Sequence, residues 1–329
     1  MKTLFKIALT VVLSVAITLG IAVVLVLTDP PKPVAERKVL DFDAYLSQDA
    51  AMPVIPPLLS TRMRDGYGLK YRRFDGPAGA PLLVLVHGSG WHGLQFVEMA
   101  AKLSEKATVF APDLRGHGTA PGRRGDIDYI AQLEDDLIDL ITAVHVPGQK
   151  IVLGGHSSGG GLVARFAGSE YGPLLDGAVL LAPFLKYNAP TTQQNSGGWE
   201  TVQLRRMIGL SILNAFHITA LNDKTVIQFA MPQQVLDGPL GDTATTAYSY
   251  RLNAGFAPRG DYLGDVAALP RFLLVAGADD SAFFADKYEG TMAPVNDKGT
   301  YVIVPGYGHL AIVDAPETAQ AILDFLDGI

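Results

Sequence analysis

The sequence contains no cysteine among its 329 residues. This absence excludes disulfide bonds, thiolate nucleophiles, cysteine-ligated iron–sulfur clusters and a lipid attached through cysteine. The seven histidines are scattered along the chain. The sequence shows no His-Glu-x-x-His spacing of the kind found in zinc enzymes, and no acidic loop of calcium-binding spacing. We therefore expect no metal site and no cofactor.

Charged residues are few, making up 18% of the chain, and the net charge is -7. The sequence has no basic stripe that would neutralise phosphates, so we expect no nucleic acid partner. Hydrophobic side chains make up 48% of the residues, which is enough for one large core. The composition thus indicates one globular domain and leaves the oligomeric state unknown.

A long apolar run lies near the N-terminus, from Ile7 to Leu27, after Lys2 and Lys6. About 20 apolar residues suffice to cross a bilayer as a helix. The alternative is a cleaved signal peptide, but its apolar region usually spans about 7–15 residues. We expect residues 1–28 to be an uncleaved single-pass membrane anchor. Basic residues also follow the run, at Lys32, Arg37 and Lys38, and the positive-inside rule counts both flanks. The short basic N-terminus still favours the cytoplasmic side, which places the rest of the chain outside the cytoplasm.

The segment after the anchor is rich in proline, and we interpret residues 29–60 as an extended linker. From Leu69 onward, short apolar segments alternate with helical periodicity, which indicates β–α–β units and a largely parallel sheet with helices on both faces. We expect helices over 130–144 and Ala315–Leu326. The expected strands are Leu82–Val86, Thr108–Ala111, Ile151–Leu153, Ala178–Leu181, Phe272–Val275 and Tyr301–Val304.

The regular alternation stops after Leu185 and resumes at Arg271. An insertion of this size is too long to be a loop. We expect a mostly helical cap over about residues 186–265, lying on the carboxyl edge of the sheet where open α/β folds bind ligands. Aromatic side chains such as Trp199, Phe216 and Phe229 would either contact the substrate or form the core of the cap.

A glycine-rich turn, with the sequence GHSSG at residues 155–159, directly follows the predicted strand Ile151–Leu153. An apolar helical segment comes next, and this strand–turn–helix order is the context of a nucleophile elbow. The serine at the tip of such a turn is strained, and glycines are required where a side chain would collide with the strand or the helix. Ser157 alone fits the Gly-x-Ser-x-Gly spacing and is the candidate nucleophile.

A serine hydroxyl needs a base to accept its proton and a third group to orient that base. Asp280 and His309 each follow a predicted strand, and the order Ser, Asp, His along the chain is the one used with such an elbow. The carboxyl ends of parallel strands would bring all three to one edge of the sheet. Asp279 is the alternative carboxylate, and we favour Asp280 because it lies farther into the loop.

Acyl transfer also requires N–H donors aimed at the oxygen that becomes negative. The backbone N–H of Ser158, directly after the candidate nucleophile, is one such donor. The second is the backbone N–H of Ser89, in the small-residue loop 87–90 that follows the strand Leu82–Val86. The alternative for this loop is a simple turn between a strand and a helix.

Taken together, these motifs resemble the signature series of the α/β-hydrolases. The series here is HGSG at 87–90, PDLRGHG at 112–118, GHSSG at 155–159, GADD at 277–280 and GH at 308–309. The chain is most similar to the branch of monoacylglycerol lipases, lysophospholipases and related serine aminopeptidases, and the segments 64–66 and 128–130 are similar to that branch as well. The resemblance covers about residues 60–329. One departure is Ser158, where that branch usually has methionine.

The resemblance implies an α/β-hydrolase domain over 61–329, with the cap after the sixth core strand and a Ser157–Asp280–His309 triad. It implies an esterase- or lipase-like activity on monoacyl or small apolar esters. Aminopeptidase or amidase cleavage, carbon–carbon bond hydrolysis and acyl transfer use the same triad and are the alternatives. A non-catalytic, membrane-tethered binding protein is the alternative from another class, although such proteins normally show a broken triad.

Overall fold

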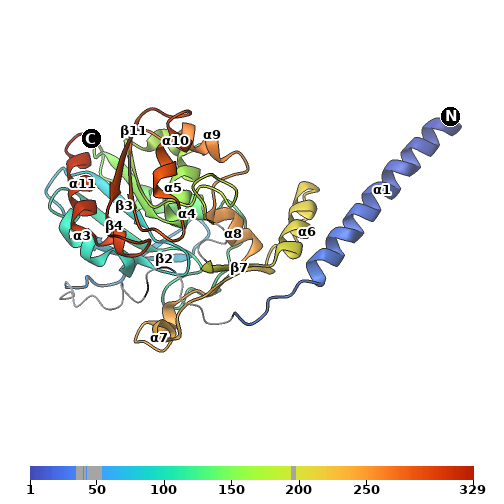
Figure 1. Ribbon diagram of the computed structural model, residues 1–329, viewed down its shortest axis with the longest axis horizontal. Helices are drawn as coiled ribbons and strands as arrows, with labels where there is room; N and C mark the ends of the chain where they lie inside the picture. Colours follow the sequence, from blue (N-terminus) through green and yellow to red (C-terminus); the bar gives the residue numbers. More distant parts are fainter. Residues whose placement is uncertain (35–39, 41, 43–53, 194–197) are drawn as a thin grey trace.

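The computed structural model describes residues 1–34, 40, 42, 54–193 and 198–329. Of the predicted linker, residues 35–39, 41 and 43–53 lie outside this described part. The described chain forms a rounded α/β domain, from which one long helix projects (Figure 1). That helix, α1 (Lys2–Leu27), has 26 residues. By length and composition it is the one helix of the described residues that could cross a membrane.

An eight-stranded sheet forms the centre of the domain, in the order β1-β2-β4-β3-β5-β6-β10-β11. All pairs from β4 to β11 are parallel, whereas β1 and β2 are antiparallel to their neighbours. This confirms the predicted mostly parallel sheet. The strands are β1 (Leu59–Arg62), β2 (Gly68–Phe74), β3 (Leu82–Val86), β4 (Thr108–Asp113), β5 (Ile151–His156), β6 (Gly177–Leu181), β10 (Phe272–Gly277) and β11 (Gly299–Val304).

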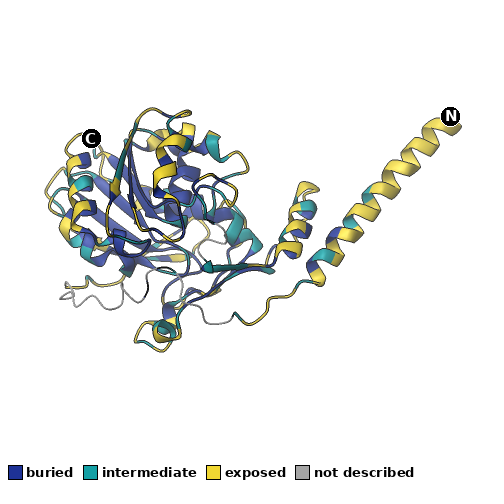
Figure 2. Ribbon diagram, viewed as in Figure 1, coloured by how far each residue is buried: buried dark blue, intermediate teal, exposed yellow. Residues whose placement is uncertain are grey.

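Each of the six predicted strands is present, and β3, β5, β6 and β10 are buried at every position (Figure 2). Strands covered on both faces have this continuous apolar pattern. The first two strands were not predicted, because β1 is largely exposed at the sheet edge and β2 mixes charged with apolar residues. The first two residues of β1, 59 and 60, lie within the predicted linker.

Helices cover both faces of the sheet (Figure 1). Helices α3 (Val97–Leu103) and α11 (Pro316–Leu326) pack together on one face. On the other face, α4 (Gln132–Val144) packs against α5 (Ser158–Ala167). The remaining short helix of the sheet domain, α10 (Tyr288–Met292), follows β10. Helices thus cover both faces of the sheet, and the loops at its carboxyl edge are available to form a site.

The cap follows β6, as predicted, but it is mixed rather than mostly helical. Its strands β7, β8 and β9 form an antiparallel sheet. Strands of three to five residues are too short to show a period of two in the sequence. The elements are β7 (Glu200–Val202), α6 (Leu204–Ala215), β8 (Thr225–Phe229), α7 (Gln233–Leu236), β9 (Ala247–Ser249), α8 (Tyr250–Phe256) and α9 (Tyr262–Ala267).

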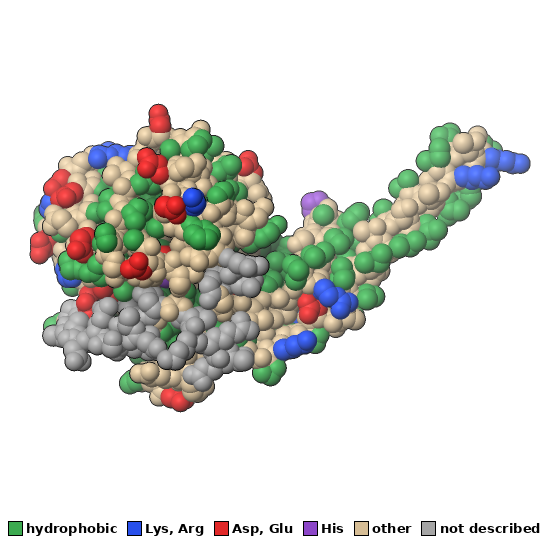
Figure 3. Space-filling view, viewed as in Figure 1, with side chains coloured by type: hydrophobic (Ala, Val, Ile, Leu, Met, Phe, Trp, Pro, Cys, Tyr) green, Lys and Arg blue, Asp and Glu red, His purple; other side chains and the backbone are tan. Residues whose placement is uncertain are grey.

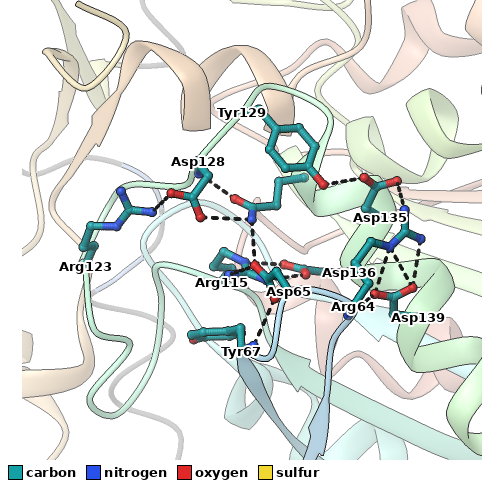
Figure 4. A network of polar contacts seen from close by, with 11 residues as sticks. Arg64, Asp65, Tyr67, Arg115, Arg123, Asp128, Tyr129, Asp135, Asp136 and Asp139 are labelled. Atoms are coloured by element: carbon teal, nitrogen blue, oxygen red, sulfur yellow. Dashed lines mark hydrogen bonds and ion pairs between the residues drawn. The ribbon is translucent and has the colours of Figure 1, made fainter. Parts of the chain in front are cut away.

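The two outer motifs of the resemblance, at 64–66 and 128–130, belong to one polar network (Figure 4). Arg64 binds Asp139 of α4, with Nη2 and Oδ1 2.8 Å apart. Asp65 accepts from Arg115, at 2.8 Å, and from Gln132, at 3.2 Å. Gln132 also donates to Asp128 at 3.2 Å. These motifs therefore fasten the β1–β2 turn and the loop after β4 to α4.

Asp314 is a carboxyl group at which we expect stability to depend on pH. Its Oδ1 is buried and has no hydrogen-bond partner among the described residues. Burial, and then the nearby Glu98, raise the pKa of Asp314 from 3.8 to about 7. The folded state thus binds this proton more tightly than the unfolded state does. The stability that the folded state gains by binding this proton is complete below about pH 4 and is lost as the pH rises through about 7.

Asp314→Asn, which mimics the protonated carboxyl, is expected to stabilise the chain at pH 8 but not at pH 4. At about 1.4 kcal/mol per pKa unit, the gain in the free energy of unfolding is roughly 2–4 kcal/mol. Urea unfolding in detergent at the two pH values measures it. The matched control is Asp297→Asn, because Asp297 is exposed. An equal effect of Asp314→Asn at both pH values would contradict the assignment.

Candidate active site

Ser157 lies at the turn between β5 and α5, in a backbone conformation with φ 55° and ψ -120°. A residue other than glycine rarely adopts a positive φ, and such strain is typical of functional turns. The turn also needs its glycines. A Cβ atom on Gly155 would collide with the Gly159 carbonyl, and one on Gly159 would collide with the Val86 carbonyl. The segment has the geometry expected of a nucleophile elbow.

The structure brings the predicted Ser157, Asp280 and His309 together at the carboxyl edge of the sheet. His309, after β11, places its Nε2 3.0 Å from the Ser157 Oγ. The other ring nitrogen, Nδ1, lies 2.8 Å from Oδ2 of Asp280, which follows β10. His309 and Asp280 are both buried. The alternative carboxylate, Asp279, is exposed.

The surroundings of Asp280 favour its ionised form. Its Oδ1 accepts hydrogen bonds from the backbone N–H groups of Ala282 and Phe283, at 2.7 and 2.9 Å. Burial pushes the pKa of Asp280 upward, but His309 and these two donors together hold it below its usual value. An ionised carboxylate only accepts, so Nδ1 of His309 donates to it. In the neutral ring, Nε2 then offers its lone pair to the Ser157 hydroxyl.

A chain of three hydrogen bonds links His309 to the loop 87–90. Burial, with a contribution from His309, lowers the pKa of His156 to about 3, so its ring is neutral near pH 7. Its Nε2 donates to the His309 carbonyl at 2.8 Å, and its Nδ1 accepts from Gln95 at 2.8 Å. Gln95 in turn accepts from the Gly88 N–H at 2.9 Å. Every donor in the chain meets an acceptor, which fixes the loop relative to His309.

The two predicted oxyanion donors, Ser89 and Ser158, lie on segments that touch. Their hydroxyl oxygens are 2.6 Å apart. Within the part of the chain that the structure describes, neither backbone N–H donates to a protein acceptor. The peptides beside Ser89 are held by buried side chains, since Gly88 donates to Gln95 and Gly90 donates to Tyr248 at 2.7 Å. The Ser89 N–H thus lies between two fixed peptides and is free to bind a substrate oxygen, which is what an oxyanion site requires.

Tyr248, from strand β9 of the cap, was not singled out in the sequence. Its hydroxyl lies 2.7 Å from Nε2 of His117. His117 places Nδ1 3.1 Å from the Arg115 carbonyl, so Nδ1 donates there and Nε2 accepts from Tyr248. Burial lowers the pKa of His117 to about 4, which keeps the ring neutral. Tyr248 can therefore donate to His117 while it accepts from Gly90, and it connects the cap to the loop 87–90.

The three cap aromatics named from the sequence have different places. Trp199 and Phe229 are buried and stacked, with ring centroids 5.3 Å apart, and Phe229 also contacts Tyr248. These rings form the core of the cap beside Gly90. Phe216 is 43% exposed at the end of α6 and does not join them. Among the described residues, no group of three or more acidic or histidine side chains could hold a metal ion.

Comparison with known proteins identifies the family. Residues 83–321 match the model of the alpha/beta hydrolase family. The chain spans about a third of the length of the first curated relatives that it matches, uncharacterized mycobacterial proteins that are 33% identical over 129 residues (39% of this chain, 36% of theirs). A monoacylglycerol lipase of Mycolicibacterium smegmatis is 31% identical over 109 residues, covering 31% of this chain and 39% of that protein.

Solved structures agree with this fold. A soluble variant of the Saccharomyces cerevisiae monoglyceride lipase superposes with a TM-score of 0.63 and 17% identity, over 85% of this chain and 97% of that one. A bacterial membrane phospholipase A superposes with a TM-score of 0.57 and 19% identity, over 100% of this chain and 99% of that one. These likenesses concern the fold. Because the family match covers most of the chain and the fold agrees with it, the chain belongs to the alpha/beta hydrolase family and has monoacylglycerol lipases among its relatives.

Proposed function

We propose that this hydrolase is a carboxylic-ester hydrolase of the esterase and lipase type, which forms an acyl-enzyme on Ser157. The observation that carries the proposal is the continuous contact from Ser157 Oγ to His309 Nε2, at 3.0 Å, and from His309 Nδ1 to Asp280, at 2.8 Å. A nucleophile, a base and an ionised carboxylate in this order can activate a serine hydroxyl. The catalytic domain is residues 61–329, with the cap at about 186–265.

In the proposed reaction, His309 removes the Ser157 proton as Oγ attacks the ester carbonyl. The N–H groups of Ser89 and Ser158 bind the oxygen that becomes negative, and one such donor is typically worth about 10²–10³ in rate. His309 then gives the proton to the leaving alcohol. Water, activated by the same ring, later releases the acid. Asp280 keeps the ring oriented and stabilises its cation.

We also propose that α1 stays attached as a membrane anchor. Helix α6 of the cap packs on the C-terminal part of α1. Gly209 of α6 lies against Ala22 and Val26 of α1, which are both buried, and cleavage of α1 would expose this face of α6. Lys2 and Lys6 favour a cytoplasmic N-terminus, which puts the catalytic domain outside the cytoplasm. A site held at a bilayer favours lipid-like monoacyl esters over strictly water-soluble ones.

The choice of an ester substrate is tested by comparing p-nitrophenyl esters of increasing acyl length with aminoacyl p-nitroanilides. We expect a fluorophosphonate probe to label the full-length protein, and kcat/KM to be at least about tenfold higher on the best ester, a difference of about 1.4 kcal/mol. Faster turnover of the anilides would indicate an aminopeptidase instead. A folded protein that the probe does not label would support the non-catalytic binding protein.

A further inference from the structure

Helices α1 and α6 are antiparallel, and hydrogen bonds join the C-terminal end of α1 to the N-terminal end of α6. The Arg206 Nε donates to the Val26 carbonyl at 3.0 Å, in the last turn of α1. In return, Asp29 Oδ2 accepts from the backbone N–H groups of Arg205 and Arg206, at 3.0 and 3.4 Å, in the first turn of α6. Helix ends leave such groups without partners inside their own helix. A side chain of α6 therefore caps α1, and a side chain of the segment directly after α1 caps α6.

The two helices also approach closely along their length. A Cβ atom on Gly209 would lie 2.5 Å from the Ala22 carbonyl oxygen, so only glycine permits this approach. Contact through small residues is typical of helix pairs in membranes. Arg206 also donates to the Thr225 carbonyl of β8, at 3.0 Å. The pair is thereby fixed to the sheet of the cap and is not a loose attachment.

The outer face of α6 and the turn after it expose apolar side chains. Figure 3 shows hydrophobic side chains on α1 and on the part of the cap beside it. Isolated exposed apolar residues are common, but a row that continues from a membrane-length helix indicates a shared apolar environment. The exposed fractions are 61% for Leu204, 45% for Ile208, 43% for Phe216 and 38% for Ile218.

Two polar side chains at the turn after α6 are paired with one another, whereas His217 at its tip is exposed. Asn214 Nδ2 donates to Asn222 Oδ1 at 2.7 Å, and Asn222 Nδ2 donates to Asn214 Oδ1 at 2.9 Å. The Ile218 N–H donates to the Leu213 carbonyl at 2.9 Å. Non-helical backbone enters a bilayer only when its polar groups find such internal partners. These pairings reduce the number of polar groups that the turn would present to lipid.

We propose that the α6 hairpin, residues 204–222, inserts into the bilayer that α1 spans, with Phe216 and Ile218 among the lipid acyl chains. The 12 residues of α6 are about 18 Å long at about 1.5 Å per residue. The hairpin starts level with Asp29, and its tip therefore enters a hydrocarbon core of about 30 Å without crossing it. This inference rests on the anchor proposed above. It goes beyond the proposed anchor, because it places a segment of the cap, in addition to α1, inside the bilayer.

The absence of cysteine permits single-cysteine labelling of the full-length protein. Ile218→Cys, Val12→Cys in α1 and Asp237→Cys are each labelled with the dye NBD. Asp237 is exposed beside α7, on the side of the cap away from the N-terminus of α1 (Figure 1). The variants are placed in phosphatidylcholine vesicles whose acyl chains carry bromine at mid-chain, a short-range quencher. We expect the label at 218 to lose emission to an extent comparable to that at 12, and the label at 237 to be unaffected.

Quenching at 12 without quenching at 218 would overturn the hairpin proposal and leave the anchor in place. Quenching at neither position would overturn both. Energy transfer between differently labelled copies at 218, without lipid quenching, would show that a second copy covers this face, which also overturns the proposal. Ester turnover of the three variants is measured in parallel, so failure of the proposed activity is recorded separately.

Discussion

Ser157→Ala is expected to reduce kcat on the best p-nitrophenyl ester by about 10³–10⁶-fold. The variant has no nucleophile, so the His309 base has no proton to remove and no acyl-enzyme forms. The Ser89 and Ser158 donors remain and account for any residual rate. Alanine takes the same positive φ with similar strain, so the elbow should persist. Initial rates and fluorophosphonate labelling measure the effect, and labelling should disappear.

The matched control is Ser104→Ala, at the end of α3, where the hydroxyl donates to the Ala101 carbonyl at 2.7 Å. It removes a hydroxyl of the same kind outside the candidate site and should leave turnover and labelling unchanged. Circular dichroism and thermal unfolding of both variants show whether the fold is kept. Retained ester turnover in a folded Ser157→Ala protein would refute the acyl-enzyme mechanism.

The sequence was sufficient where the chemistry is local. The elbow is five consecutive residues between a strand and a helix, and the glycine requirement acts within that segment. Asp280 and His309 could also be located, because parallel strands end at one edge of a sheet. The continuous apolar sequences of β3, β5 and β10 also predicted that these strands are buried. In each case the signal lies within a few residues of the feature that it predicts.

The remaining features depend on contacts between distant segments. The Tyr248 hydroxyl meets a backbone N–H 158 residues away, and Arg206 meets a carbonyl 180 residues away. No local pattern in the sequence encodes either contact. Gln95 was missed for a related reason, since its role depends on the direction of a side chain in a loop. The choice between Asp279 and Asp280 also required coordinates, because the two neighbours have the same side chain and differ in orientation.

Asp280→Asn is expected to lower kcat by about 10⁴-fold with a smaller change in KM. Oδ1 of Asp280 accepts two backbone N–H groups, so the carboxamide oxygen takes that place and the amide NH₂ faces the His309 Nδ1. Nδ1 must then accept, and the ring carries its proton on Nε2. That nitrogen can no longer remove the Ser157 proton.

The matched control for this substitution is Asp279→Asn, in which an exposed carboxylate is lost one residue away. It should leave kcat unchanged, because the Asp280–His309 contact is intact. Steady-state kinetics on one ester separate the two variants, and thermal unfolding confirms that both are folded. A large loss in Asp279→Asn with none in Asp280→Asn would assign the orienting role to Asp279. The 2.8 Å contact between Asp280 and His309 predicts the opposite result.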